Sequence, residues 1–215
     1  VGVADRWKPF PGADALAAIR GIEIVPLDLT DERSVASLAA DLGGKTDILI
    51  NTAEHVRPGG IAAMRLTDLR DAMETDAIGL ARLASAFGPA MRGRGADGTN
   101  NAVAWVNLLS VHALVNWPAY GAWSAAQAAA RSLAECLRAE LRPGGIRVVN
   151  VFSGPLDTEW FQAVPPPKVA PPALAAAVRD ALESGLEDVF VGDVAKDIRD
   201  RLAENPKAVE RELAE

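Results

Sequence analysis

Apolar residues follow two alternating patterns along this chain. Short continuous apolar runs, rich in Val, Ile and Leu, alternate with longer stretches in which apolar residues recur every three or four positions. The first pattern predicts strands that are buried on both faces, and the second predicts amphipathic helices. We expect strands at 21–29, 46–51, 102–110 and 145–153, and helices at 31–42, 66–91, 124–141 and 173–185.

The order of these elements predicts the fold class. Strands that alternate with helices of ten or more residues form parallel βαβ units, so we expect an α/β fold with an open, doubly wound sheet. The stretch 93–101 reads as a loop by composition, and the proline-rich stretch 163–172 is too short for an interdomain tether. We therefore expect one domain over residues 1–215.

Composition and charge narrow the range of partners. The formal net charge is −7, which gives no electrostatic reason to expect nucleic acid or anionic lipid as a partner. Cys136 is the only cysteine and reads as a small core residue of a helix, and with two scattered histidines it makes no metal site. No apolar run approaches the ~20 residues of a membrane span, and no signal peptide is visible, so we expect a cytoplasmic protein.

Ligands of an open parallel sheet bind outside the carboxyl ends of its strands. Polar or flexible residues stand at four such ends, which makes them candidate site residues. These are Asp28 after the first predicted strand, Asn51 after the second, Ser110 after the third, and Gly154 and Thr158 after the fourth.

Five segments at these positions resemble motifs of the short-chain dehydrogenase/reductase family, in the family's order. They are "LDLTD", "ILINTAE", "ETDAIGL", "VNLLSVHA" and "NVFSGPLDT". The resemblance implies a Rossmann-like fold and NAD(P)-dependent oxidation or reduction of a carbonyl or alcohol. It also implies that Ser110 is a catalytic residue, and that the cofactor contacts are Asp28, Asn51, Ala53, Gly154 and Thr158.

The same resemblance exposes departures at the catalytic positions. The family places its tyrosine thirteen residues after the serine and its lysine four residues later, which here gives Trp123 and Gln127. An indole N–H donates a hydrogen bond but does not titrate, and an amide is neutral, so neither residue replaces the proton relay. The family's helix asparagine is Asp76, and Glu54 stands where the family has a glycine beside the cofactor. Only Ser110 remains of the four catalytic positions.

We therefore expect an oxidoreductase-like protein that has lost the family's catalysis and acts as a structural or regulatory subunit. Two alternatives stay open: an active enzyme with unconventional catalytic residues, or a non-redox binding protein for a nucleotide or small molecule. Tyr120 and His112 are conceivable proton donors, although packing roles are expected for both. The alanine-rich helices 66–91 and 124–141 are expected to contact a second copy or a paralogue of the family.

The family's phosphate loop, "TGxxxGxG", has no counterpart in this sequence, and its absence together with Glu54 argues against binding of NAD(P). The stretch 2–12 instead resembles the end of the family's second strand, where Asp5 or Arg6 would meet the adenosine ribose. The first strand of a doubly wound sheet lies in its middle. Further N-terminal residues, a partner chain, or pairing of strand 1–5 with strand 46–51 could close the resulting gap.

Overall fold

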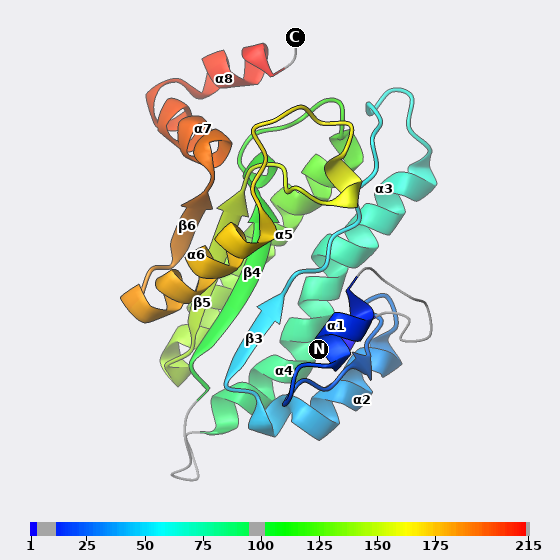
Figure 1. Ribbon diagram of the computed structural model, residues 1–215, viewed down its shortest axis with the longest axis vertical. Helices are drawn as coiled ribbons and strands as arrows, with labels where there is room; N and C mark the ends of the chain where they lie inside the picture. Colours follow the sequence, from blue (N-terminus) through cyan, green and yellow to red (C-terminus); the bar gives the residue numbers. More distant parts are fainter. Residues whose placement is uncertain (4–11, 95–101, 214–215) are drawn as a thin grey trace.

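The computed structural model describes residues 1–3, 12–94 and 102–213. Its main sheet has four parallel strands in the order β3-β4-β5-β6 (Figure 1). The strands are β3 (Ile48–Asn51), β4 (Ala104–Ser110), β5 (Arg147–Ser153) and β6 (Asp188–Val191). Helices connect these strands, so the expected α/β class with a parallel, Rossmann-like sheet is confirmed.

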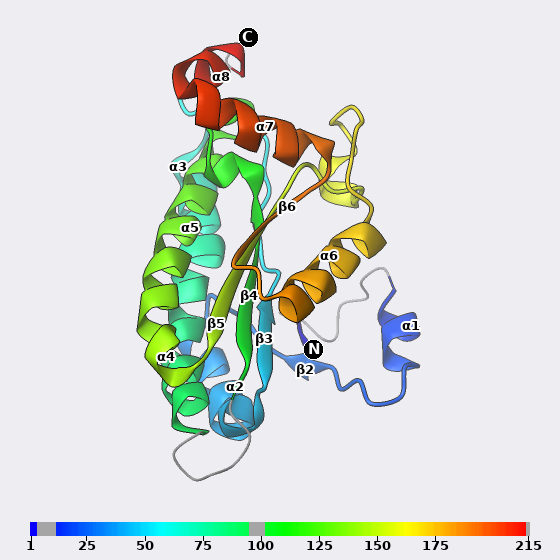
Figure 2. The same cartoon turned by 90° about the vertical axis from the view of Figure 1, so that its left-hand side faces the viewer.

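Helices cover both faces of the main sheet. Figure 2 shows α4 (Gly79–Gly93) and α5 (Gly121–Leu141) on one face and α6 (Pro171–Ser184) on the other. Successive side chains of a strand point to opposite faces. In β4, accordingly, Trp105 packs in a core cluster with residues of α4 and α5, whereas Val106 packs in a cluster with residues of α6. The remaining helices are α1 (Ala13–Ala17), α2 (Glu32–Leu42), α3 (Leu66–Ala72), α7 (Asp193–Glu204) and α8 (Pro206–Glu212).

The predicted helix 66–91 is not one regular helix. It consists of α3, a π-helical segment Met73–Ile78, and α4. The wider π-helical turn lies against α5 and carries Asp76, which is 2% exposed. Such segments inside α-helices often occur at functional sites. Here the π-helical segment carries the buried carboxyl of Asp76.

The N-terminal region departs most from the expectation. The predicted strand 21–29 is wrong in extent: only β2 (Val25–Pro26) is a strand, and Gly21 at its expected start has a positive φ of 89°, which extended strands do not adopt. β2 pairs in parallel with β1 (Gly2–Val3), in a separate two-stranded sheet. Pairing of 1–5 with 46–51 is therefore wrong for residues 1–3. Asp5, Arg6 and most of the predicted loop 93–101 lie outside the described residues.

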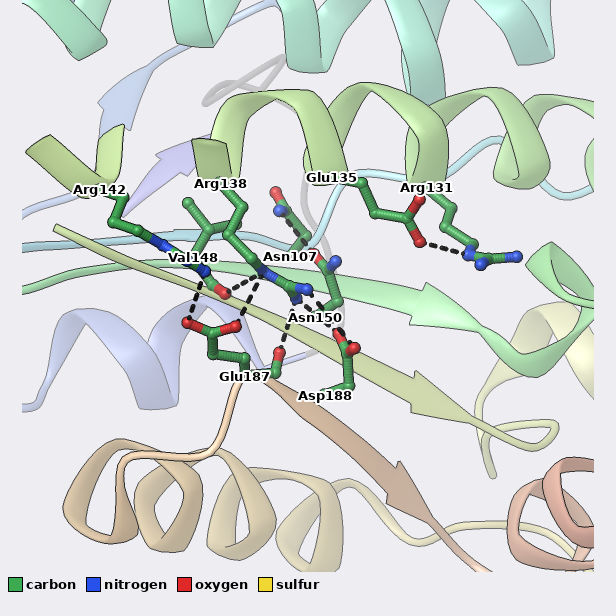
Figure 3. A network of polar contacts seen from close by, with 9 residues as sticks. All are labelled: Asn107, Arg131, Glu135, Arg138, Arg142, Val148, Asn150, Glu187 and Asp188. Carbon is green, nitrogen blue, oxygen red and sulfur yellow. Dashed lines mark hydrogen bonds and ion pairs between the residues drawn. The ribbon is translucent and has the colours of Figure 1, made fainter. Parts of the chain in front are cut away.

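Arg138 fastens α5 to the end of the main sheet (Figure 3). Its Nε donates to the Val148 carbonyl at 3.1 Å, and its Nη2 donates to the Glu187 carbonyl at 2.9 Å and to Asp188 Oδ1 at 2.5 Å. These bonds join α5 to β5 and β6. The arginine thereby holds the C-terminal part of α5 against β5 and β6.

A row of asparagines crosses the main sheet in register. Asn51 of β3 is the partner of Asn107 in β4, which is in turn the partner of Asn150 in β5. Asn107 Nδ2 donates to Asn150 Oδ1 at 3.1 Å, and Trp105 Nε1 donates to Asn107 Oδ1 at 2.8 Å (Figure 3 shows the two asparagines). Because buried amides cost free energy unless they are bonded, this network favours one register of the central strands.

The structure bears on three features that composition addressed: the cysteine, metal sites and membrane-spanning helices. Cys136 is exposed on α5, so the expectation of a core cysteine is wrong. No group of three or more His, Cys, Asp or Glu side chains among the described residues is arranged to hold a metal ion. Within the same part of the chain, no helix has the length and apolar character needed to cross a membrane.

Candidate functional site

Two hollows meet at the carboxyl end of β3. The larger is a groove of about 730 Å³ between the β1–β2 sheet and β3, and the smaller is a cavity of about 90 Å³ at the ends of β4 and β5. Thr52 and Glu54, in the loop after β3, line both. The loop residues therefore stand between a groove and a cavity, each formed by different strands.

The smaller cavity is lined by several residues that the family-like sequence motifs predict to lie close together. Ser110 at the end of β4 and Trp123 in the first turn of α5 both line it, and so do Gly154 after β5 and Glu54. Its other walls are mostly apolar and include Leu108, Leu156, Phe161 and Leu174. The spacing from Ser110 to Trp123 along the sequence therefore correctly predicts that the two residues lie at the same cavity. The cavity is therefore lined by a few polar side chains together with apolar ones.

Gln127 links Ser110 to the π-helical segment. Its Oε1 accepts the backbone N–H of Ser110 at 2.9 Å, and its Nε2 donates to Asp76 Oδ2 at 2.9 Å. The other Asp76 oxygen, Oδ1, accepts the backbone N–H of His55 at 2.7 Å. Gln127 is 2% exposed, so it acts here as a buried bridge and has no access to bulk solvent.

Two carboxyls interact in this region: Asp76 is fully buried, and Glu54 is half-buried in the loop after β3. Burial, and next the negative charge of Asp76, raise the pKa of Glu54 from 4.5 to about 7. Burial also raises the pKa of Asp76 from 3.8 to about 7, against the opposing hydrogen bonds from Gln127 and the His55 backbone. Both carboxyls therefore change charge near neutral pH, whereas exposed carboxyls are fully ionised there.

The indole N–H of Trp123 is an unpartnered donor at the cavity. Trp123 is 2% exposed, and its Nε1 has no hydrogen-bond partner among the described residues. It nevertheless faces Glu54 closely enough to oppose the rise of the Glu54 pKa. Ser110 Oγ accepts the His112 N–H at 3.1 Å, and no described residue accepts the Ser110 hydroxyl hydrogen. One donor at this cavity, the Ser110 hydroxyl, thus lacks an acceptor in the described part of the chain, and the other, the Trp123 N–H, has only a poorly formed contact with Glu54.

Tyr120 and His112 are packing residues in this arrangement. The Tyr120 ring lies 4.4 Å from the ring of Trp117 and 6.1 Å from that of Trp123, measured between centroids. His112 stacks on Trp117 at 4.5 Å, and burial lowers the pKa of its imidazole to about 4. The imidazole is therefore neutral near pH 7 and is held in an aromatic cluster.

The residues expected to contact a cofactor divide between the two hollows. Asp28, Asn51 and Ala53 line the groove, and Gly154 lines the cavity. Thr158 borders neither; it precedes the short turn Glu159–Phe161. Asp28 Oδ1 accepts the Thr30 backbone N–H and hydroxyl, and Asn51 Oδ1 accepts the Ala53 N–H at 3.2 Å.

The charge of the groove does not fit a pyrophosphate. Its described lining includes the carboxyls of Asp28 and Glu54 but no lysine or arginine. Phosphate groups bind to cationic side chains or to backbone N–H groups at helix N-termini. Apolar residues supply most of the wall, among them Leu38, Ile50, Leu83 and Phe87. The described groove could accept an apolar or uncharged group, but these residues do not fit the phosphates of a dinucleotide.

Comparison with known proteins identifies the family. Residues 5–196 match the family model described as enoyl-(acyl carrier protein) reductase. This chain belongs to the short-chain dehydrogenase/reductase family. A short-chain dehydrogenase of Burkholderia cenocepacia, solved in complex with NADP, is 34% identical with a TM-score of 0.84, over 99% of this chain and 84% of that one. A short-chain dehydrogenase of Streptomyces avermitilis is 26% identical with a TM-score of 0.78, over the same shares of the two chains.

Curated relatives of this short-chain dehydrogenase/reductase are longer than the chain. An uncharacterized oxidoreductase of Mycobacterium tuberculosis is 30% identical over 79% of this chain and 52% of its own length. A short-chain dehydrogenase of Talaromyces islandicus is 30% identical over 67% of this chain and 50% of its own. The chain thus spans about half the length of the curated relatives it matches, and it is oxidoreductase-like by family.

Sequence reasoning missed the part that Gln127 plays. The spacing showed that it replaces a lysine, but it gave no sign that both ends of its amide are bonded. The signal that could have found it is the pairing of Gln127 with Asp76, where the family has lysine and asparagine. An amide beside a buried carboxyl can donate to it, and the two substitutions are chemically complementary.

Proposed function

We propose that this short-chain dehydrogenase/reductase does not carry out the family's hydride transfer and acts as a structural or regulatory subunit. The observation that carries the proposal is the buried Trp123 beside Ser110, where the family has its proton-transferring tyrosine. An indole N–H does not titrate, and Gln127 supplies no positive charge. General acid–base catalysis is worth roughly 10²–10⁴-fold in rate, so its loss alone removes most activity.

The electrostatics of the groove support the same proposal. NAD(P) is the cofactor that the resemblance implies, yet the described groove presents Asp28 and Glu54 and no basic side chain. Like charges repel, and the polar groups of a phosphate would lose water without gaining partners. We propose that the residues described here do not hold a nicotinamide dinucleotide.

Turnover of reduced and oxidised nicotinamide, with a panel of simple ketones and alcohols, tests the proposal. We expect no turnover from this protein, while a family member that keeps tyrosine and lysine shows that the assay works. Trp123→Tyr alone is expected to stay inactive, because the lysine charge is still missing. Reduction of a carbonyl by the unmutated protein at ~1 s⁻¹ or faster would overturn the proposal.

The helices α4 and α5 are proposed as the assembly face of this subunit. A hollow of about 280 Å³ lies between them and is lined mostly by small and apolar residues. Leu133 in this lining is 37% exposed. We propose that a second copy covers the face, and a family paralogue with the same helices is the alternative occupant.

Sedimentation of the protein at micromolar concentration tests the assembly face. We expect a species larger than a monomer, which Leu133→Lys converts to monomer. Leu186→Lys is the matched control, because Leu186 is 51% exposed and follows α6 on the opposite face of the sheet. A monomer with the unmutated chain alone, and again after mixing with a paralogue, would contradict the proposal.

A further inference from the structure

The cavity beside Glu54 has the parts of an acid–base site that needs no nicotinamide. Its lining combines one carboxyl, from Glu54, with two donors: the Ser110 O–H, which no described residue accepts, and the Trp123 N–H, which is close to Glu54 but makes no well-formed hydrogen bond to it. Asp76, the other carboxyl, is held by two hydrogen bonds and does not line the cavity. Glu54 is therefore the carboxyl that a molecule in the cavity would meet.

We propose that Glu54, Ser110 and Trp123 form a proton-transfer site for a small ketone or aldehyde. Ser110 Oγ–H and Trp123 Nε1–H would donate to the carbonyl oxygen, and the Glu54 carboxylate would act as the base. Two donors aimed at one oxygen stabilise the charge that develops there, which is the usual function of an oxyanion hole.

The reaction is enolisation, and it balances without an oxidant or reductant. Glu54 takes the proton from the carbon next to the carbonyl, and that C–H bond breaks. Its electron pair forms a carbon–carbon double bond, while the carbonyl π pair moves to the oxygen held by Ser110 and Trp123. Return of a proton from Glu54 to carbon regenerates the carbonyl. Exchange of that proton with solvent, or its return to another position, gives hydrogen exchange or isomerisation.

The environment of Glu54 suits the role of a general base. A general base is most effective when its pKa lies near the working pH, and burial together with Asp76 raises that of Glu54 to about 7. Asp76 is the charged group that acts on Glu54, and the nearby His112 is neutral at this pH. A carboxylate at this position is thus a stronger base than an exposed one.

Size and access limit the substrate. A cavity of about 90 Å³ is comparable to the space that roughly three waters occupy in the liquid, which suits a molecule of few carbons. The apolar wall formed by Leu156, Phe161 and Leu174 would face its alkyl part. Because Thr52 and Glu54 also line the groove, the groove offers a route to the base. We infer a short, uncharged carbonyl compound.

Proton exchange of acetone, butan-2-one and hydroxyacetone in heavy water tests the proposal. Loss of the α-proton signals is followed by nuclear magnetic resonance, with protein present and with buffer alone, and with no nicotinamide added. We expect exchange above the buffer rate that is proportional to protein concentration and increases through about pH 7, where Glu54 ionises. Hydride transfer cannot contribute, so this result is independent of the proposed function.

Three variants locate the activity. Glu54→Gln removes the base and is expected to reduce the exchange rate by ~10²-fold or more. Ser110→Ala removes one donor and is expected to reduce it by ~10²-fold. Glu159→Gln is the matched control, because Glu159 is exposed and does not line the cavity. Exchange at the buffer rate with all three ketones, or a Glu54→Gln variant as active as the control, would overturn the proposal.

Discussion

The half-buried carboxyl of Glu54 makes the stability of the protein depend on pH in a definite direction. The folded state raises its pKa from 4.5 to about 7, so the folded chain holds this proton more tightly than the unfolded chain. Between these two pH values the folded state binds more protons, and the free energy of unfolding decreases as the pH increases. The stabilising contribution is fully present below about pH 4.5 and is lost by about pH 7.

The magnitude follows from the same two values. A rise from 4.5 to about 7 corresponds to about 3 kcal/mol at most, since each pKa unit is worth ~1.4 kcal/mol. Glu54→Gln keeps the shape of the protonated side chain but cannot ionise. The variant should therefore gain stability relative to the unmutated protein as the pH increases, by up to about 3 kcal/mol above pH 7. Loss of the Glu54 charge should also lower the pKa of Asp76, which acts in the same direction.

Urea unfolding at several pH values between about 5 and 8 measures this difference, with the slope of the transition checked for constancy. Glu159→Gln serves as the control, because an exposed carboxyl should give a difference that changes little with pH. Parallel pH profiles for the Glu54→Gln variant and the unmutated protein would refute the reasoning, since they would mean that Glu54 ionises normally in the folded state.

Three further substitutions test the packing around the site by urea unfolding. Gln127→Leu leaves the Ser110 N–H and one oxygen of the Asp76 carboxyl without partners and should destabilise by about 2–4 kcal/mol; an unchanged stability would contradict this. Trp105→Phe deprives Asn107 Oδ1 of its donor and should cost about 1–3 kcal/mol; a cost close to zero would mean that the asparagine network re-forms. Gly192→Ala should cost more than ~1 kcal/mol, because φ is 87° and the new Cβ would lie 2.5 Å from Val169; a neutral result would show that this loop adjusts freely.

The sequence predicted those parts of the fold that depend on local pattern. Continuous apolar runs located β3, β4 and β5, and helical periodicity located α2, α5 and α6, because burial on both faces and burial of one stripe leave different spacings. It failed for the N-terminal strand 21–29, where the apolar residues suggest a long strand but only Val25–Pro26 pairs with another strand and Gly21 adopts a positive φ. It also could not find the π-helical turn, since one extra residue in a turn scarcely changes the apolar spacing.

The site was predictable in its position but not in its electrostatics. Counting from Ser110 places Trp123 correctly, because spacing along a strand and helix fixes which residues meet at the sheet edge. It does not give the depth of burial, which decides whether Glu54 and Asp76 are ordinary carboxylates or carboxyls that titrate near pH 7. Nor does it show whether Gln127 points to solvent or to two buried partners.

The substitutions at the site are best understood as a set. Ser110 presents a buried N–H that needs an acceptor, and Asp76 presents a buried oxygen that needs a donor. Gln127 satisfies both with one amide, whereas a lysine at this position could serve Asp76 but has no acceptor for Ser110. Gln127→Lys would therefore leave one buried group unpaired, at a cost of about 1–3 kcal/mol.

A site that had only decayed would contain unpaired groups at such positions, but here the hydrogen bonds between helix, strand and π-helical turn are complete around Gln127. At the cavity itself, the Trp123 Nε1–H has no well-formed hydrogen bond to a described residue and the Ser110 hydroxyl is free to donate, so both can serve a ligand that lies beside Glu54.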